Sequence, residues 1–242
     1  MNQSYLIGID IGTSACKVAL FDRSGCVLAA ANGDYPVYYP KEGWAEQNPE
    51  EWWSAVCGAV RQVIEEASVA PEEIAGVGID GQSWSAIAID RNGHVLTNTP
   101  IWMDTRAQSV CDRLNEEIGA EAIFEVAGNS LQPSYTTAKI LWYKENLPEV
   151  YAKIDKILQS NSFIAFKLTG AVSQDLSQGY GLHCFDMRTG KWNEAMCEKL
   201  GIPVEFLPEI VPCDHVVGTV TKKAAEECGL AEGTPVVAGG LD

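Results

Sequence analysis

The sequence predicts an α/β fold, because short β-rich runs are combined with a segment that carries clear helical signals. Three β-rich runs come first, at 5–11, 16–22 and 26–31. The helical segment follows them, and an apolar run at about 74–79 comes next. This order of three strands, one helix and one strand favours a mixed β-sheet flanked by helices.

The connections between the first three runs are short and rich in turn residues. YLIGIDI at 5–11 is separated from CKVALFD at 16–22 by the small, polar sequence GTSA. The sequence DRSG leads from the second run into CVLAAA at 26–31, and Asp, Ser and Gly favour tight turns. We therefore expect hairpins to join these strands.

The sequence NPEE at 48–51 has the signals of a helix start. Asn48 can cap the first turn, Pro49 suits the first helical position and Glu51 places an acid at the third. Apolar residues then recur near helical spacing, at Trp52, Val56, Ala59, Val60 and Val63. We expect a helix from about 49 to 68.

The rest of the chain has weaker signals. Between about 120 and 220, Pro and Gly recur and the hydrophobic periodicity is weak, which predicts an irregular insertion in a single domain over 1–242. No low-complexity linker divides the chain. We expect further strands at about 85–90 and 235–238, and helices at about 105–118, 136–146, 160–168 and 221–228.

The composition excludes several classes of partner. With 33 acidic against 17 basic residues, the net charge of −16 repels nucleic-acid backbones and anionic membrane surfaces. No apolar run approaches the roughly 18 residues that a membrane span needs, and the first residues lack a secretory signal. The eight cysteines include no CxxC pair, so we expect reduced thiols and no zinc site. These features predict a cytoplasmic protein without a nucleic-acid or membrane partner.

The segment GIDIGTSACKVALFD at 8–22 has the pattern of a phosphate-binding hairpin. Asp10 ends a buried strand, and the small residues after it let backbone NH groups face an anion. Asp10 is the candidate ligand of a Mg²⁺ ion, through water. An ordinary hairpin with a polar turn is the alternative. The candidates for phosphate contact are Gly12, Thr13, Ser14 and Lys17.

Two other nucleotide-binding patterns are excluded. GVGIDG at 76–81 matches the G-x-G-x-x-G fingerprint, which must follow a strand and open a helix. Here QSWSAIAID follows instead, with the alternation of a strand. The sequence also has no G-x-x-x-x-G-K-[ST] motif, which excludes a P-loop ATPase.

Segment 8–22 resembles the first phosphate motif of the actin-like ATPase superfamily, which includes sugar kinases, actin and Hsp70-type chaperones. Further blocks resemble the FGGY carbohydrate kinases in particular, and they keep that family's order along essentially all 242 residues. These blocks are EGWAEQNPEEWW at 42–53, PIWMDTRA at 100–107, Ser134-Tyr135-Thr136 with the K-x-x-W pair Lys139 and Trp142, LTG at 168–170, and the final GGLD.

The resemblance implies a ribonuclease-H-like fold and transfer of a phosphoryl group from ATP, with Mg²⁺, to a ketopentose such as xylulose. In the family, the aspartate of the Gly-Gly-x-Asp block is the general base, a role that falls here on Asp242, beside Asp10 as the second catalytic acid. Residues 1–242 correspond to the sugar-binding domain, and the family's carboxy-terminal nucleotide-binding domain is absent from this chain. We therefore expect the chain alone to be inactive.

Gln82, Ser83 and Trp84 occupy positions where family members face the sugar. Glycerol kinases carry an Arg-Glu pair after this glutamine, and xylulokinases carry Met-His. Ser83-Trp84 stands here instead, which disfavours glycerol and leaves xylulose open. The alternative is a buried strand connection with Trp84 in the core.

Trp102, Asp104 and Arg106 are the remaining candidates for sugar contact. The carboxylate and the guanidinium can bind neighbouring hydroxyls, and the indole can form an apolar wall. Alternatively, Asp104 caps a helix at 105 and Arg106 pairs across a surface. The pair Lys139 and Trp142 is more typical of packing than of catalysis.

Two rival functions differ in sequence features. An actin- or chaperone-like ATPase shares segment 8–22 but should lack PIWMDTRA and the K-x-x-W pair. A non-catalytic sugar-sensing relative should have lost Asp10 or Asp242, and both are present. The expected partners are a sugar and ATP. The sequence leaves open a homodimer, the identity of the sugar and the hydroxyl that is phosphorylated.

Overall fold

The computed structural model describes residues 4–242 and is built around a seven-stranded mixed sheet. Its order is β13-β14-β5-β1-β2-β3, and β15 also pairs with β5. The strands are β1 (Tyr5–Ile11), β2 (Ala15–Phe21), β3 (Val27–Asp34), β5 (Ile74–Gly81), β13 (Val216–Thr219), β14 (Pro235–Val237) and β15 (Gly240–Leu241). The pairs β1-β2, β2-β3 and β13-β14 are antiparallel, whereas β5 runs parallel to β1, β14 and β15. The predicted mixed sheet and its opening hairpins are confirmed.

Alternation along β1 decides which face of the sheet is covered. Ile7, Ile9 and Ile11 are buried, whereas Gly8 and Asp10 point to the opposite face. Side chains of a strand alternate between faces, so the isoleucines lie against the helices. The residues that could meet a ligand therefore share the other face.

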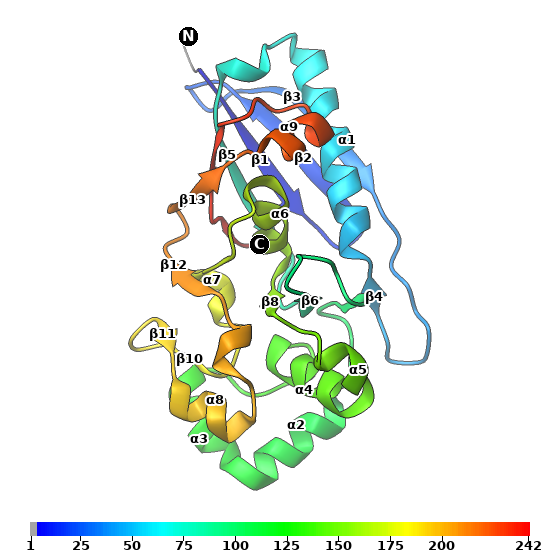
Figure 1. The fold of residues 1–242 in the computed structure, drawn as a ribbon, viewed down its shortest axis with the longest axis vertical. Coiled ribbons are helices and arrows are strands. Elements are labelled where there is room, and N and C mark those ends of the chain that lie inside the picture. Colours follow the sequence, from blue (N-terminus) through cyan, green and yellow to red (C-terminus); the bar gives the residue numbers. More distant parts are fainter. Residues whose placement is uncertain (1–3) are drawn as a thin grey trace.

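Three helices cover the buried face of the sheet (Figure 1). Helix α1 (Pro49–Ala67) packs on β2 and β3, and the side chain of Asn48 accepts a hydrogen bond from Glu50 N, as its capping role predicts. Helix α6 (Ser160–Thr169) packs on β5, and α9 (Lys222–Cys228) contacts both other helices. Among residues 4–242, no helix combines the length and the hydrophobicity that a membrane-spanning segment requires.

A second hydrophobic core lies beside the first, in the lower half of Figure 1. Its buried residues fall between Ala86 and Leu207, and α4 (Thr136–Asn146) runs through its centre, with Ala138, Ile140 and Trp142 buried. Around α4 lie α2 (Gln108–Leu114), a π-helical turn (Asn115–Gly119), α3 (Ala120–Ala127), α5 (Pro148–Tyr151) and α8 (Glu194–Leu200).

Short elements connect the two cores. They form two-stranded ribbons together with the single-turn helix α7 (Leu176–Gly179). The ribbons pair β4 (Glu46–Gln47) with β7 (Thr99–Pro100), β6 (Ile87–Ile89) with β8 (Lys156–Leu158), β9 (Ser173–Asp175) with β12 (Glu209–Val211), and β10 (Phe185–Asp186) with β11 (Lys191–Trp192).

Most of the predicted elements are present with small changes of boundary. The helices predicted at 49–68 and 136–146 end within one residue of their predicted ends. The helix predicted at 105–118 begins at Gln108 and changes to π-helical geometry at Asn115. The stretch 120–220, predicted as irregular, contains helices and short strands that supply much of the second core.

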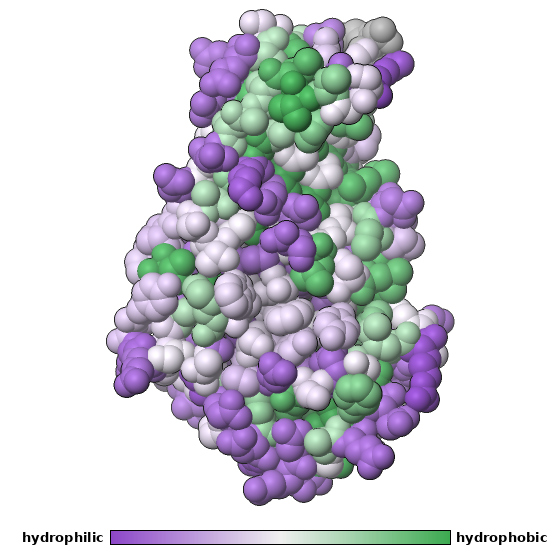
Figure 2. All heavy atoms as spheres, turned by 180° about the vertical axis from the view of Figure 1, so that it is seen from behind, coloured by the Kyte–Doolittle hydropathy of each residue, from purple (hydrophilic) through white to green (hydrophobic). Residues whose placement is uncertain are grey.

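The face of the sheet opposite the helices is open in the described residues. Seen from behind, apolar residues gather on the upper part of the molecule (Figure 2). A shallow apolar hollow of about 470 Å³ is lined there by residues that include Leu6, Phe21 and Val216, and Leu6 and Val216 are about half exposed. Bare apolar surface of this kind is typical of an interface.

Candidate active site

Hydrogen bonds to its backbone hold the turn between β1 and β2 in place. The amide of Gly12 donates to Ala15 O, 3.1 Å away, and a side chain at Gly12 would press against that oxygen. The carbonyl of Gly12 accepts from Tyr35 Oη at 2.7 Å, and that of Thr13 accepts from Gln47 Nε2 at 2.8 Å. These contacts fix the turn in one shape, while Ser14 at its tip is exposed.

Three carboxylates lie at the same end of neighbouring strands. Asp10 of β1 is the register partner of Asp80 of β5, and Gly240 of β15 pairs with Asp80 from the other side. The amide of Asp242 donates to Gly81 O at 3.2 Å, so the last residue follows directly at this end. Asp10 and Asp242 are thus separated by a single strand.

Lys17 is the cation of this group. It is the register partner of Asp10 on β2, and its Nζ lies 3.0 Å from Asp10 Oδ2. The hydrogen bond to Asp10 raises the pKa of Lys17, and the charges of Asp242 and Asp80 add to the effect. Burial raises the pKa of Asp80, and the charges of Asp10 and Asp242 raise it further. The four groups therefore lie within electrostatic range of one another.

Asp10 has a free coordination position. Its Oδ1 is buried and has no hydrogen-bond partner among the described residues, although Oδ2 pairs with Lys17. A buried carboxylate oxygen without a partner is unfavourable unless a cation or a water molecule meets it. A hollow of about 380 Å³ on the open face of the sheet is lined by residues that include Asp10, Lys17, Gly78 and Asp80. The geometry fits a hydrated cation or a phosphate there.

Gln82 joins the turn between β1 and β2, residues 12–14, to the segment after β5. We call residues 12–14 the phosphate turn, because the sequence predicts phosphate contacts there. Its Nε2 donates to Gly12 O at 3.2 Å and to Gln47 Oε1 at 2.8 Å, and its amide donates to Ile11 O at 2.7 Å. The side chain is buried, yet its Oε1 has no partner among residues 4–242. Ser83 beside it is half-buried.

Trp84 has an unusual backbone conformation. Its φ of 62° lies in the left-handed region, which is unfavourable for a residue with a side chain. Its ring stacks on Tyr135 with centroids 4.0 Å apart and meets Tyr180 at 6.4 Å. The indole nitrogen is buried without a partner in the described chain. Strain of this kind is found at binding and catalytic sites more often than elsewhere.

Trp102, which follows β7, contacts the phosphate turn. Its Nε1 donates to Thr13 Oγ1 at 3.1 Å, and 45% of the residue's surface is exposed. The indole therefore forms an open wall next to the turn. The structure brings Trp102 and Gln82 together around the turn that carries Gly12 and Thr13.

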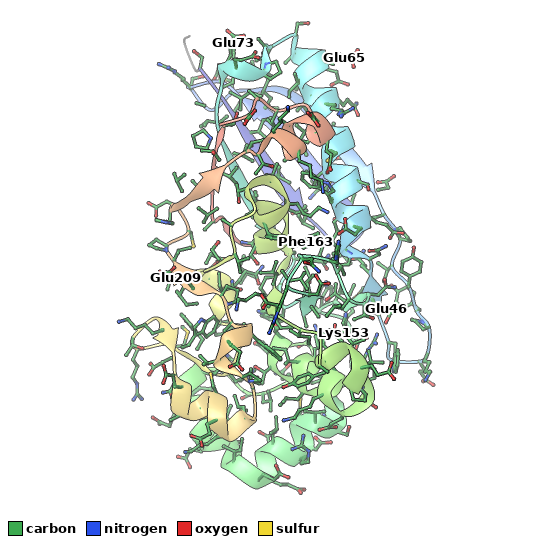
Figure 3. The ribbon with its side chains drawn as sticks, viewed as in Figure 1. Glu46, Glu65, Glu73, Lys153, Phe163 and Glu209 are labelled. Carbon is green, nitrogen blue, oxygen red and sulfur yellow. The ribbon has the colours of Figure 1, made fainter. Side chains whose placement is uncertain are left out.

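Asp104 and Arg106 form a buried ion pair. The guanidinium binds both oxygens of Asp104 and reaches Glu46 at 2.7 Å, and Asp104 Oδ2 also accepts from Ala45 N at 2.7 Å. Glu46 lies on β4 beside the junction of the two cores (Figure 3). Arg106 also lies 3.8 Å from the Trp44 ring centroid.

The alternative roles considered for Asp104 and Arg106 are wrong in detail. The first helical turn here begins at Gln108 with Ala107 as its cap, so Asp104 does not cap a helix. Arg106 has only 4% of its side chain exposed and is not a surface residue. The ion pair holds the PIWMDTRA segment against β4. Each buried charge has a partner of opposite sign, which offsets the cost of removing it from water.

A cluster of polar side chains holds the backbone that precedes Asp242 by hydrogen bonds. Ser177 Oγ accepts from Leu241 N at 2.8 Å and donates to Asp175 Oδ1 at 2.6 Å. Asn161 Nδ2 donates to Asp175 Oδ2 at 2.8 Å and to Ala238 O at 3.1 Å. The side chains of Asn161, Asp175 and Ser177 lie in α6, β9 and α7, so these elements support the last strand.

Asp80 and Tyr135 lie at the site although neither was among the site residues predicted from the sequence. Asp80 had a usable signal, because Gly8-Ile9-Asp10 and Gly78-Ile79-Asp80 repeat the same three residues and pair residue by residue in the sheet. Tyr135 stood in a family block, but only the fold brings it against Trp84. Asp175 and Ser177 carried no pattern that marks a site.

Known proteins similar to this chain are sugar and polyol kinases. The family model described as "FGGY family of carbohydrate kinases, N-terminal domain" matches residues 5–242. The chain is 32% identical to a xylulose kinase of Bacillus subtilis over 98% of its own length and 48% of the relative's. A glycerol kinase of Carboxydothermus hydrogenoformans is 31% identical over 90% of this chain and 45% of the relative.

Solved structures of xylulose kinases are also similar to this chain. The crystal structure of a xylulose kinase from Rhodospirillum rubrum matches with a TM-score of 0.93 and 27% identity, over 98% of this chain and 49% of that one. The chain thus spans about half the length of the proteins that it matches. Because the family model matches residues 5–242, the chain belongs to the FGGY family of carbohydrate kinases and corresponds to their N-terminal domain.

Proposed function

We propose that this chain is the sugar-binding half of an ATP-dependent carbohydrate kinase in which Asp242 acts as the general base. The observation that carries the proposal is the shared strand end of β1, β5 and β15, where Asp10 and Asp242 flank Asp80 beside the phosphate turn. Phosphoryl transfer depends on positioning and on neutralising charge, and this arrangement supports both. The family membership and the names of the relatives support the same reaction.

In this proposal the sugar hydroxyl loses its proton to Asp242 as its oxygen bonds to the terminal phosphorus of ATP. The bond between that phosphorus and the bridging oxygen breaks, and ADP leaves. Thr13 and Ser14 offer backbone NH groups to the phosphate oxygens, and Gly12, which has no side chain, lets those oxygens approach the turn closely. Lys17 supplies a positive charge at the same edge. Thr13, bonded to Trp102, connects the phosphate side to the sugar side.

We propose Mg²⁺ as the cation that Asp10 holds. The unpartnered Oδ1 of Asp10 and the acidic surroundings of Asp80 and Asp242 favour a small divalent cation over a bare phosphate. Such an ion supplies charge neutralisation for the phosphate groups when it is bound. The net charge of −16 makes this compensation necessary, because the chain as a whole repels ATP.

We propose a ketopentose such as xylulose as the sugar. Xylulose kinases recur among the relatives, and Trp102 offers an apolar wall while Gln82 Oε1 offers a free acceptor. Ser83 and Trp84 complete this side of the pocket. Asp104 and Arg106 already bind protein groups, so we propose that they act by placing Trp102 and do not compete for the sugar.

We also propose that the protein works in a reducing compartment, the cytoplasm. All eight cysteines are free thiols. Burial raises the pKa of Cys57 and Cys111 to about 12, which keeps both thiols protonated and unreactive near neutral pH.

The test is ADP release by a protein that joins this chain to a nucleotide-binding half, assayed with ketopentoses, aldohexonates and polyols. The proposal expects ATP consumption that depends on a ketopentose. An actin- or chaperone-like ATPase would instead consume ATP without any sugar, and a sugar-sensing relative would bind sugar without turnover. Either of these results would overturn the proposed function.

A further inference from the structure

Lys139 on α4 is a fully buried cation whose three protons all point at backbone carbonyls. Its Nζ donates to Trp84 O at 2.7 Å, Ile101 O at 2.9 Å and Ser134 O at 2.6 Å. An ammonium group has three donors and no acceptor, so these bonds use its full capacity.

Burial lowers the pKa of Lys139 to about 7. The nearby carboxylate of Asp104 opposes this shift and the guanidinium of Arg106 adds to it. Carbonyl oxygens prefer the charged form, so the three bonds stabilise the ammonium in place. An apolar side chain of the same length would fill this part of the core without the desolvation penalty of a charge. Packing alone therefore does not explain a lysine here.

The three acceptors belong to three separate segments, and each segment carries an aromatic residue of the candidate sugar pocket. Trp84 is itself an acceptor, Trp102 follows Ile101, and Tyr135 follows Ser134. Trp84 stacks on Tyr135, and Trp102 bonds to the phosphate turn. A single ammonium thus binds the backbone of all three segments that carry these rings.

Other residues of α4 bind only one of these segments. Thr136 Oγ1 donates to Ser85 O at 3.0 Å, and Tyr143 Oη donates to Ala86 O at 2.9 Å. Positions 136, 139 and 143 lie on one helix face, which therefore follows the backbone at 84–86. Lys139 alone of the three also reaches the segments of Ile101 and Ser134.

We propose that Lys139 is a positioning residue of the sugar pocket, which holds Trp84, Trp102 and Tyr135 in their binding arrangement before the sugar arrives. This inference rests on the proposed kinase function. It predicts that loss of the ammonium weakens sugar binding and leaves ATP binding unchanged, because the phosphate turn is held by Tyr35 and Gln47.

The test compares Lys139→Met with the parent kinase and with Lys144→Met as the matched control. Lys144 lies on the same helix and is exposed, and its Nζ lies 3.4 Å from Gly201 O and 5.9 Å from the Tyr151 ring centroid, away from the candidate sugar pocket. We expect the KM for the sugar to rise at least about tenfold in Lys139→Met, with the KM for ATP within about twofold, as loss of pocket pre-organisation predicts. Lys144→Met should match the parent.

Lys139→Arg is the second variant, because it keeps the charge but replaces three divergent donors by a planar fork. It should also raise the sugar KM selectively. A sugar KM within twofold of the parent in a folded Lys139 variant overturns the inference. Unfolding of both variants assigns Lys139 to folding and overturns it as well. A parent without sugar-dependent ADP release removes the proposed function and this inference together, whereas an active parent with unchanged variants removes only the inference.

Discussion

At the scale of single residues, the site depends on positions where backbones approach closely. Gly239 has a φ of 78°, and a Cβ there would collide with the carbonyl group of Ile79. Its amide donates to Cys213 O at 2.9 Å. The residue lets the final strand reach β5, so Asp242 can stand next to Asp80 only because position 239 has no side chain.

Alanine substitutions at Gly239 and Gly233 separate the cost of a left-handed backbone conformation from the cost of a steric collision of the new Cβ atom. Gly239→Ala should lower stability by more than about 1 kcal/mol and reduce kcat, because the collision displaces the strand that carries Asp242. Gly233→Ala is the control, since Gly233 has a φ of 89° but open space around its Cβ position. Urea unfolding and steady-state kinetics measure both effects. Equal kcat values in the two variants would contradict this role of Gly239.

At the scale of elements, local signals predicted helices better than they predicted the site. Asn48, Pro49 and the apolar spacing after them lie within one segment, so the boundaries of α1 could be read directly. The pairing of Asp10 with Asp80 joins strands that are 70 positions apart and depends on the parallel register of β1 and β5. Stacking of Trp84 on Tyr135 also requires tertiary packing, which no local pattern contains.

The same distinction applies to Asp104 and Arg106. The spacing of a carboxylate and a guanidinium indicated polar recognition, and both residues do make dense polar contacts. Their partners are Glu46 and Ala45 on the distant β4 segment, however, and a single sequence does not reveal such partners. The type of interaction was predictable from the residues, but its target was not.

The contact between α4 and the segment after α7 predicts a dependence of stability on pH. His183 is buried, its Nδ1 lies 3.0 Å from Thr137 Oγ1, and burial lowers its pKa to about 4. The unfolded chain, with an ordinary histidine pKa near 6.5, binds more protons than the folded chain between pH 6.5 and pH 4. Stability therefore falls as the pH falls through this window.

Histidine variants isolate this contribution. Between pH 7 and pH 5 the parent should lose about 2 kcal/mol that His183→Gln does not lose. His94→Gln is the control, because His94 is largely exposed. Urea unfolding at both pH values provides the measurement. Parallel losses in the parent and His183→Gln would show that His183 is not held neutral in the fold.

At the scale of the whole molecule, two cores meet around the candidate pocket. The sheet supplies Asp10, Asp80 and the phosphate turn, and the helical core supplies Tyr135 and Lys139 on or beside α4. Ribbons such as β4-β7 and the segment 82–86 connect them, and Phe163 of α6 lies at the junction in Figure 3. The sheet face opposite the helices is open in the described residues, and the chain spans about half the length of the relatives that it matches.

Asp242 is proposed to remove the proton from the sugar hydroxyl at the strand end that it shares with Asp10 and Asp80. This role is tested by kcat for Asp242→Asn in the protein that joins this chain to a nucleotide-binding half, with Asp112→Asn, an exposed site on α2, as the control. General-base catalysis contributes about 10²- to 10⁴-fold, so kcat should fall by at least about a hundredfold while the sugar KM stays within about threefold. Asp112→Asn should match the parent. A folded Asp242→Asn enzyme that keeps kcat within tenfold of the parent would contradict the claim.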